Sequence, residues 1–150
     1  MDNIKLIDIT ADNWEEICCL HPGKEGAEFV APNAFSIAQS VYEKGWKIKG
    51  IAKDDTLIGF TMFGYSKEME AYELCRFMIA QRYQGLGYGA EALKVIVDFM
   101  FSHFKCKEIY LSTAPNNSRG KHIYEKFGFV STGETCGDED DIEEIYCLKS

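Results

Sequence analysis

Apolar side chains along the chain follow two spacings, the two-residue alternation of strands and the three-to-four-residue recurrence of helices. The clearest helix is expected over residues 88–104, where six residues share one helical face: Ala92, Val95, Ile96, Phe99, Met100 and His103. The pattern also predicts strands over residues 4–9, 46–53, 56–65, 70–80, 109–113 and 142–148, and helices over residues 14–20, 34–42 and 118–127. Asn33 is expected to cap the helix 34–42, and Gly128 to end the helix 118–127. This order predicts a mixed α/β (α+β) domain whose N-terminal half is rich in strands.

One domain accounts for the whole chain of 150 residues. No internal repeat, low-complexity tract or linker-like run divides it, and 46% hydrophobic with 27% charged residues is typical of an ordinary globular protein. The 24 acidic residues outnumber the 16 basic ones, and the net charge of -8 repels phosphate backbones and anionic lipids. We therefore expect neither a nucleic acid nor a membrane as partner.

The sequence also shows no sorting signal or metal-ligand motif. Its N-terminal residues lack the basic and apolar regions of a signal peptide, and no apolar run approaches the ~18 residues that span a bilayer. The six cysteines have no CxxC spacing, and the three histidines have no metal-binding spacing. We expect a cytoplasmic protein with reduced cysteines and no metal site.

A glycine-rich turn, residues 82–89 with the sequence RYQGLGYG, stands between the predicted strand 70–80 and the predicted helix 88–104. Glycines at alternate positions let the backbone adopt positive φ angles and free several N–H groups to point at one anion. The positive end of the following helix dipole acts on the same spot, so the turn predicts a site for a pyrophosphate. The alternative is that the glycines only permit a sharp corner between strand and helix.

Two known nucleotide motifs fit this turn less well. A P-loop needs a lysine and then a serine or threonine after its last glycine, and these are absent. Gly85, Gly87 and Ala90 satisfy the dinucleotide-binding pattern GxGxxA, but the pattern lies in the middle of the chain. The next predicted strand ends in Ser112 and Thr113, without the acidic residue that binds a ribose. A nicotinamide-dependent oxidoreductase is therefore the last of the alternatives.

The turn resembles the acetyl-CoA motif of the GNAT N-acetyltransferases, which is Arg or Gln, two residues, Gly, one residue, then Gly or Ala. Residues 82–87 fit this motif, and a second signature of the family follows as Asn117, Tyr124 and the pair Gly128 and Phe129. The expected elements follow the family's layout across nearly the whole chain. Within the family, residues 76–79, 106–112, 123–129 and 132–134 are similar to those of bacterial spermine/spermidine acetyltransferases.

This resemblance implies a mixed, mostly antiparallel sheet that splays open between the strands 70–80 and 109–113, with helices on both faces. It also implies acetyl-CoA as the cosubstrate, with the pantetheine arm in the gap like an added strand and the pyrophosphate on the glycine-rich turn. The residues expected to bind acetyl-CoA are Phe77, Met78, Ile79, Arg82, Gln84, Gly85, Leu86, Gly87, Tyr88, Gly89, Ala90, Asn117 and Tyr124.

Amide formation from a thioester needs a neutral amine, a site for the developing oxyanion and a proton for the leaving thiolate. A backbone N–H near Met78 or Ile79 is expected to bind the oxyanion. Tyr124 is the expected acid, because the pKa of a phenol, ~10, lies close to that of a thiol, ~8.5. Polyamine enzymes of this family commonly carry a carboxylate where this chain has Cys75, so Glu73, two residues earlier on the same strand face, is the best substitute base. The residues expected at the acceptor site are Glu28, Glu73, Cys75 and Glu134.

The leading interpretation is acetyl transfer to a primary amine of a polyamine or diamine, a small-molecule acceptor, by direct attack in a ternary complex. The acidic run 134–144 would suit a polycation, or would form only a solvated hairpin tip. Two alternatives remain, another acceptor such as an amino acid, a peptide N-terminus or an antibiotic, and an acyl-CoA-binding regulatory module without catalysis. The resemblance leaves the oligomeric state open, a homodimer included.

Overall fold

The helices and strands occur in the order that the hydrophobic pattern predicts, with one strand added. The computed structural model describes residues 3–150. The strands are β1 (Ile4–Ile7), β2 (Trp46–Lys53), β3 (Thr56–Ser66), β4 (Ala71–Ile79), β5 (Glu108–Thr113), β6 (Val130–Cys136) and β7 (Glu143–Lys149). The α-helices are α1 (Trp14–Cys19), α2 (Asn33–Tyr42), α3 (Tyr88–Phe104) and α4 (Ser118–Phe127), and two short 3₁₀ helices are η1 (Gly26–Glu28) and η2 (Gln81–Tyr83).

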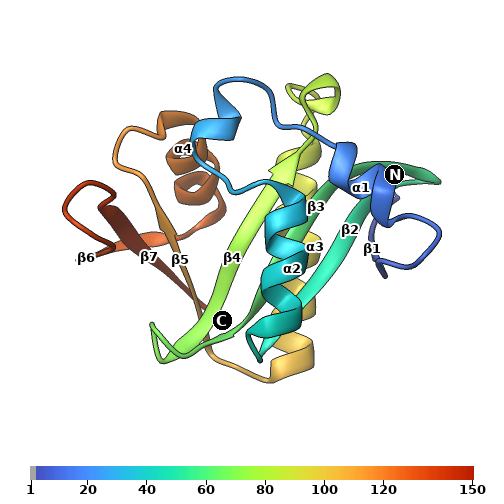
Figure 1. Ribbon diagram of the computed structural model, residues 1–150. Coiled ribbons are helices and arrows are strands. Elements are labelled where there is room, and N and C mark those ends of the chain that lie inside the picture. Colours follow the sequence, from blue (N-terminus) through green and yellow to red (C-terminus); the bar gives the residue numbers. More distant parts are fainter. Residues whose placement is uncertain (1–2) are drawn as a thin grey trace.

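The seven strands form one sheet in the order β1-β2-β3-β4-β5-β7-β6. Neighbouring strands are antiparallel except β4 and β5, which run parallel. Within residues 3–150, these two strands pair at Glu73 and Tyr110 alone, near the start of each strand, and then diverge (Figure 1). The predicted mixed sheet that splays open at its centre is confirmed.

Helices cover both faces of this sheet, as predicted. The helices α1 and α2 lie on one face and α3 on the other (Figure 1). The helix α3 packs against β1, β4 and β5 around a core that includes Phe63 and Leu93. The opposite face carries a second cluster, in which Ile17 of α1 contacts the side of the sheet that bears Phe60 and Met62. Burial of this apolar surface stabilises both layers. No helix within residues 3–150 is long and apolar enough to cross a membrane.

Two details of the predicted helices are wrong. The helix α3 has the predicted bounds, but its buried stripe is rotated toward Leu93 and Val97, and His103 is exposed. A helix lying flat on a broad sheet buries adjacent pairs of positions, which widens the stripe beyond the spacing used for the prediction. Asn33 does not cap α2. It is the first residue of the helix, and its buried side-chain amide donates to the carbonyl oxygen of Ile17 at 2.9 Å, which ties α2 to α1.

The strand β6 is not predicted by the hydrophobic pattern. It pairs with β7 as the edge of the sheet, and most of its side chains are exposed. Its register with β7 is interrupted between Ser131 and Thr135. A strand with both faces in solvent needs no apolar alternation, so the sequence carries no periodic signal for it. The acidic run 134–144 spans the connection from β6 to β7.

Candidate active site

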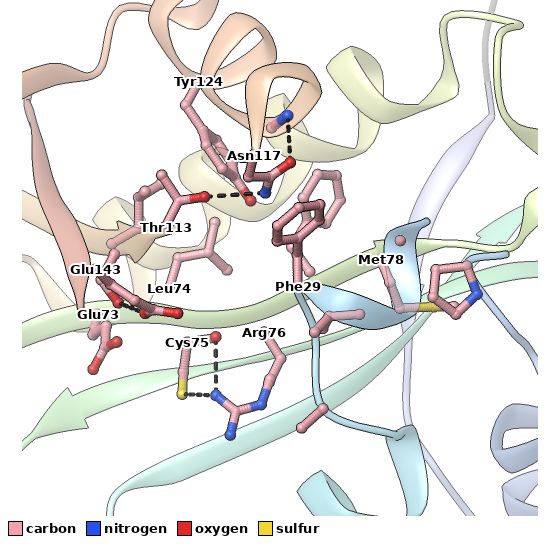
Figure 2. Close-up of a pocket in the computed structure, with 18 of the residues that line it drawn as sticks. Phe29, Glu73, Leu74, Cys75, Arg76, Met78, Thr113, Asn117, Tyr124 and Glu143 are labelled. Atoms are coloured by element: carbon pink, nitrogen blue, oxygen red, sulfur yellow. Dashed lines mark hydrogen bonds between the residues drawn. The ribbon is translucent and has the colours of Figure 1, made fainter. Parts of the chain in front are cut away.

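The diverging ends of β4 and β5 open into a cleft of about 1650 Å³ (Figure 2). The helix α4 and the segment of residues 26–32 also line it. Three kinds of group meet in this cleft: main-chain groups at the edge of β4, N–H groups of the glycine-rich turn, and a set of acidic side chains.

The edge of β4 that faces the cleft presents main-chain groups without a strand partner. The N–H of Ala80 donates to the carbonyl oxygen of Ile58 in β3 at 2.8 Å. Main-chain groups alternate in direction along a strand, so those of Met78, two residues before Ala80, also point toward β3. The main-chain groups of Phe77 and Ile79 point the other way, into the gap that β5 leaves. There the carbonyl oxygen of Ile79 accepts a hydrogen bond from the Gln84 side chain at 2.8 Å. The N–H of Ile79 therefore faces the cleft as expected, whereas that of Met78 does not.

The glycine-rich turn leaves backbone N–H groups free at the start of α3. Within the described part of the chain, the N–H groups of residues 85–90 have no hydrogen-bond partner. Gly85 and Gly87 have φ angles of 78° and 87°, and a Cβ added at either would meet no atom within 4 Å. The positive φ accounts for glycine at these positions, and the open space leaves room for a bound group. With the positive end of the helix dipole behind it, the turn is suited to an anion such as a pyrophosphate.

A β-bulge at Cys75 gathers side chains of β4 on the α1–α2 side of the sheet. Two consecutive residues of β3 pair with Arg76 and Leu74, so Cys75 is the extra residue of β4. Because Leu74 points into the α3 core, Glu73 and Cys75 lie on the opposite face, and they share it as predicted. Arg76 fills the space beside them. Its guanidinium donates to the carbonyl oxygen of Cys75 at 3.2 Å, to the thiol sulfur at 2.8 Å and to Gln39 at 3.2 Å.

Burial changes the acid–base properties of the two residues on this face. The pKa of the Cys75 thiol rises to about 12, mainly through burial and further through the charge of Glu73. This thiol is therefore protonated at neutral pH and cannot act as the base that the resemblance to polyamine enzymes leads us to expect at this position. Glu73 is 9% exposed, and burial raises the pKa of its carboxyl group against the lowering effect of a hydrogen bond with Ser66. A carboxylate with a raised pKa is a stronger base.

Three carboxylates gather at the end of the cleft where β4 and β5 meet, beside the guanidinium of Arg76. The positive charge of Arg76 lowers the pKa of Glu73, and the charges of Glu68 and Glu143 raise it. Glu143 accepts a hydrogen bond from the hydroxyl of Ser112 at 2.6 Å (Figure 2). The carboxylates that line the whole cleft are Glu28, Glu43, Glu68, Glu73, Asp141 and Glu143. This charge is suited to a cationic ligand.

Tyr124 reaches the cleft from α4 (Figure 2). Burial raises the pKa of its hydroxyl to about 12, and the charge of Glu143 adds to the effect. The hydroxyl has no hydrogen-bond partner within residues 3–150. The ring packs edge-on against Phe129 with the centroids 6.0 Å apart, which fixes its position. Tyr124 is therefore a protonated group that is free to donate to a ligand in the cleft.

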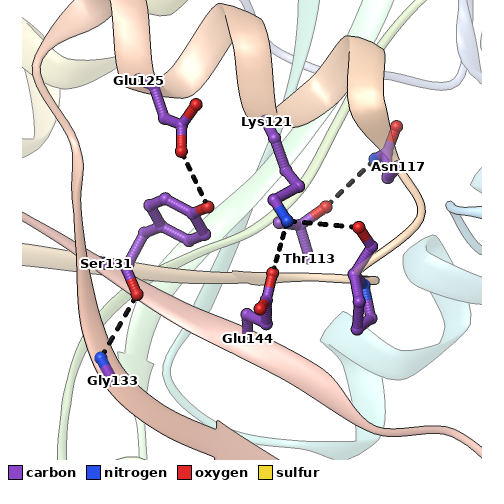
Figure 3. Close-up of polar contacts among 9 residues, drawn as sticks. Thr113, Asn117, Lys121, Glu125, Ser131, Gly133 and Glu144 are labelled. Atoms are coloured by element: carbon purple, nitrogen blue, oxygen red, sulfur yellow. Dashed lines mark hydrogen bonds and ion pairs between the residues drawn. The ribbon is translucent and has the colours of Figure 1, made fainter.

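Polar contacts hold α4, and with it the tyrosine, against β5 and β7 (Figure 3). Asn117 caps the helix, since its side-chain oxygen accepts from the N–H of Gly120 at 3.1 Å while its amide donates to Thr113 at 3.0 Å. Lys121 bridges to Glu144 of β7 at 2.7 Å. The Asn117 side chain is thus engaged within the protein, and its expected contact with pantetheine stays a prediction.

Most of the predicted site residues line the cleft: Glu28, Glu73, Cys75, Phe77, Met78, Ile79, Gln84, Gly85, Gly87, Gly89, Ala90, Asn117 and Tyr124. Four of them do not: Arg82, Leu86, Tyr88 and Glu134. Leu86 is 61% exposed, and the guanidinium of Arg82 lies 5.1 Å from the ring centroid of Tyr83. Glu134 is exposed on β6, because this edge strand presents both of its faces to solvent.

Three residues of the cleft are missed by the sequence reasoning. Glu143 is singled out there only as one member of the acidic run, and Ser112 only as the end of a strand. Arg119, in the first turn of α4, reaches the glycine-rich turn and donates to the side-chain oxygen of Gln84 at 3.0 Å. The pairing of β5 with β7 and the position of α4 bring these residues to the site, and neither is visible in the sequence alone.

Known proteins provide an independent comparison. The model of the acetyltransferase (GNAT) family matches residues 11–129. A spermine/spermidine N(1)-acetyltransferase of Bacillus subtilis (strain 168) is 30% identical over 138 residues, which cover 88% of this chain and 91% of that protein. The crystal structure of spermidine N-acetyltransferase from Vibrio cholerae in complex with CoA and spermine matches with a TM-score of 0.76 at 16% identity, over 97% of this chain and 95% of that one.

An aminoglycoside acetyltransferase in complex with coenzyme A matches with a TM-score of 0.80 at 15% identity, over 98% of this chain and 95% of that one. The fold is therefore shared with enzymes named for different acceptors, and it does not by itself identify the amine. The predicted family, fold class and enzyme class are confirmed, with acetyl-CoA as the cosubstrate. The chain belongs to the acetyltransferase (GNAT) family.

Proposed function

We propose that this protein transfers the acetyl group of acetyl-CoA to a primary amine of a polyamine or diamine, by direct attack of the amine on the thioester. The observation that carries the proposal is the composition of the cleft. Unpaired main-chain groups and an anion-binding turn occupy one part of it, and a cluster of carboxylates occupies another. The Bacillus subtilis relative, which matches over most of the chain, is named for spermine and spermidine.

The donor half of the cleft is suited to coenzyme A. The amides of a pantetheine arm can pair with the main-chain groups of Phe77 and Ile79, in the manner of an added strand. The free N–H groups of residues 85–90 can bind the pyrophosphate. Arg119, held against the turn by Gln84, adds a positive charge beside them. Acetyl-CoA bound in this way presents its thioester at the opening between β4 and β5.

Two groups of the chain serve the transfer itself. The N–H groups of Phe77 and Ile79 face the cleft, and the one that pantetheine leaves unpaired can donate to the oxyanion that forms on the thioester carbonyl. Tyr124 can protonate the departing sulfur. Its pKa of about 12 keeps it protonated, and the thiolate forms in the same buried surroundings, which raise its own pKa as well. The thiol of Cys75, with a pKa of about 12, is a poor nucleophile, which supports direct attack over an acetyl-cysteine intermediate.

The charge of the acceptor half supports a polyamine. An ammonium about 4 Å from a carboxylate is attracted by about 4 kcal/mol at an effective dielectric constant of ~20. An acceptor with a second ammonium can therefore engage a second carboxylate while its first nitrogen reacts. A monoamine of the same length lacks this second interaction. A diamine and a monoamine of equal length therefore form a matched pair of substrates that differ in one charge.

Thiol release from acetyl-CoA tests the proposal across spermine, spermidine, putrescine, lysine, a peptide amine, kanamycin and butylamine. Putrescine and butylamine have the same carbon chain, and we expect kcat/KM for putrescine to be higher by at least about tenfold, which corresponds to 1.4 kcal/mol. Equal values, or a preference for kanamycin, lysine or the peptide, would refute the polyamine assignment. Tight acetyl-CoA binding without thiol release for any amine would instead indicate a regulatory module.

Replacing Tyr124 by Phe tests the acid. The substitution removes the hydroxyl and keeps the ring packing, so we expect kcat to fall by about 100-fold or more at unchanged affinity for CoA. An unchanged rate would exclude Tyr124 as the proton donor.

A further inference from the structure

Two adjacent glutamates of β7 point to opposite faces of the sheet. Glu144 points to α4, where it binds Lys121 at 2.7 Å (Figure 3). Glu143 points into the cleft, where the hydroxyl of Ser112 donates to it at 2.6 Å (Figure 2). The alternation of side chains along a strand accounts for the difference. The carboxylate of Glu143 therefore belongs to the acceptor end of the cleft and takes no part in holding α4.

Glu143 lies further into the opening than Glu73. Glu73 pairs with Tyr110 of β5, at the point where β4 and β5 still meet. Ser112, which holds Glu143, is two residues further along β5, about 6.6 Å toward the open end at ~3.3 Å per residue. Because the two strands run parallel and diverge in this direction, Glu143 lies nearer the space that a thioester between the strands would occupy.

We propose that Glu143, oriented by Ser112, takes the proton from the attacking amine, the role that the sequence suggests for Glu73. This inference rests on the proposed function for the reaction, and it holds for whichever amine is accepted. The ammonium gives one proton to the carboxylate of Glu143. The neutral nitrogen then forms the C–N bond to the acetyl carbon, and the C–S bond breaks as Tyr124 donates its proton to the sulfur. The second proton of the nitrogen restores the Tyr124 hydroxyl, and the proton on Glu143 passes to water.

The electrostatics of the cleft support this pairing of base and acid. The charge that adds to burial in raising the pKa of Tyr124 is that of Glu143. A protonated Glu143 no longer opposes ionisation of the tyrosine, so the first proton transfer makes Tyr124 a stronger acid just before the sulfur needs a proton. The charged and titratable groups that share this end of the cleft with Glu143 include Glu68, Glu73 and Arg76, with Cys75 from the bulge and Cys136 from β6.

Three variants separate this role from that of its neighbours: Glu143→Gln, Glu73→Gln and Ser112→Ala. With the best amine from the panel, we expect Glu143→Gln to lower kcat by about 10²-fold to 10³-fold at unchanged CoA affinity and at a nearly unchanged KM for the amine. Ser112→Ala keeps the carboxylate but loses its orientation, so a fall of about tenfold is expected. Glu139→Gln, an exposed carboxylate of the same hairpin outside the cleft, is the matched control and should behave as the wild type.

The split between kcat and KM distinguishes a base from a docking group, because loss of a docking group would raise mainly the KM for the amine and leave kcat near the wild-type value. An acceptor that is already neutral then tests the proton transfer itself. With 2,2,2-trifluoroethylamine, which is largely unprotonated at neutral pH, the defect of Glu143→Gln should shrink toward wild-type rates. A full defect with this amine, a wild-type kcat for Glu143→Gln, or a loss confined to Glu73→Gln would each overturn the inference. If Glu143→Gln fails to fold, an unchanged rate for Ser112→Ala overturns it instead. Failure of the proposed function shows differently, as a wild-type enzyme that acetylates no polyamine.

Discussion

A negative charge placed at Gly87 gives the sharpest test of the donor site. Gly87 lines the cleft at the start of α3, with a φ angle of 87°, and a Cβ at this residue would have no atom within 4 Å. Asp and Asn both tolerate a positive φ better than other residues with side chains, and they have nearly the same shape. Replacing Gly87 by Asp or by Asn therefore imposes the same backbone cost and the same bulk. The two variants differ by one charge.

The magnitude follows from Coulomb's law. Taking about 6 Å between the new carboxylate and each charge of a pyrophosphate, the repulsion is about 0.7 kcal/mol per charge in bulk water and about 1.4 kcal/mol at an effective dielectric constant of ~40. Two charges then weaken binding by about 1.4 to 2.8 kcal/mol, which is about 10-fold to 100-fold in Kd. Because salt screens exposed charges, the difference should shrink at high ionic strength.

Titration calorimetry with CoA at low and high salt measures this difference. We expect Gly87→Asn to bind close to the wild type and Gly87→Asp to bind about 10-fold to 100-fold more weakly at low salt. Equal affinities of the Asp and Asn variants would show that no phosphate lies at this turn, whatever both substitutions do to the fold. The site assigned to the glycine-rich turn would then be wrong.

Three further predictions concern the acceptor side and its support. The pKa of about 12 leaves Cys75 about 1000-fold less thiolate than an ordinary cysteine of pKa 9.0, so in mass-spectrometric alkylation at pH 8 it should react far more slowly than the exposed Cys19, and similar rates would contradict its burial. Replacing Asn117 by Ala removes the cap of α4 and should lower the free energy of unfolding in urea by about 1 kcal/mol, while Asp, which can still cap, should lose less. Burial raises the pKa of Glu73 above its ordinary value of 4.5, so its contribution to stability is present below that pH and is lost as pH rises through the folded-state pKa. Glu73→Gln should therefore melt at a higher temperature than the wild type at pH 7 and at a similar one near pH 4, and a lower melting temperature at pH 7 would contradict the burial cost.

The donor half of the site could be predicted because it is local in the sequence. A strand, a glycine-rich turn and a helix follow one another over residues 71–104, and the backbone geometry of that unit alone creates the free N–H groups. The glycine positions carry the signal, since a positive φ at Gly85 and Gly87 is what such a turn requires. The same unit of strand, turn and helix predicts that β4 lies beside the gap to β5. It does not predict which N–H groups of β4 face that gap.

The acceptor half could not be predicted in the same way. Its carboxylates come from segments far apart in the chain, and strand register decides which of them meet. The bulge at Cys75 shifts the alternation of β4 by one residue, and a pattern of side chains does not reveal a bulge. On β7, a shift of one residue would exchange Glu143 for Glu144 in the cleft. Two neighbouring glutamates thus have different partners, Ser112 and Lys121, which the sequence alone does not reveal.

The geometry of the splayed sheet allows the carboxylate that we propose as base to stand on a strand other than β4. An amine that attacks a thioester between β4 and β5 is bordered by both strands, and β7 lies directly beside β5. A carboxylate can therefore reach the nitrogen from β4 or, past β5, from β7. In this chain the β4 position holds Cys75, whose thiol remains protonated, and the β7 position holds Glu143 on the hydroxyl of Ser112. The chemistry requires a base at a point in space, and either strand can supply it without a change in the backbone that binds the cosubstrate.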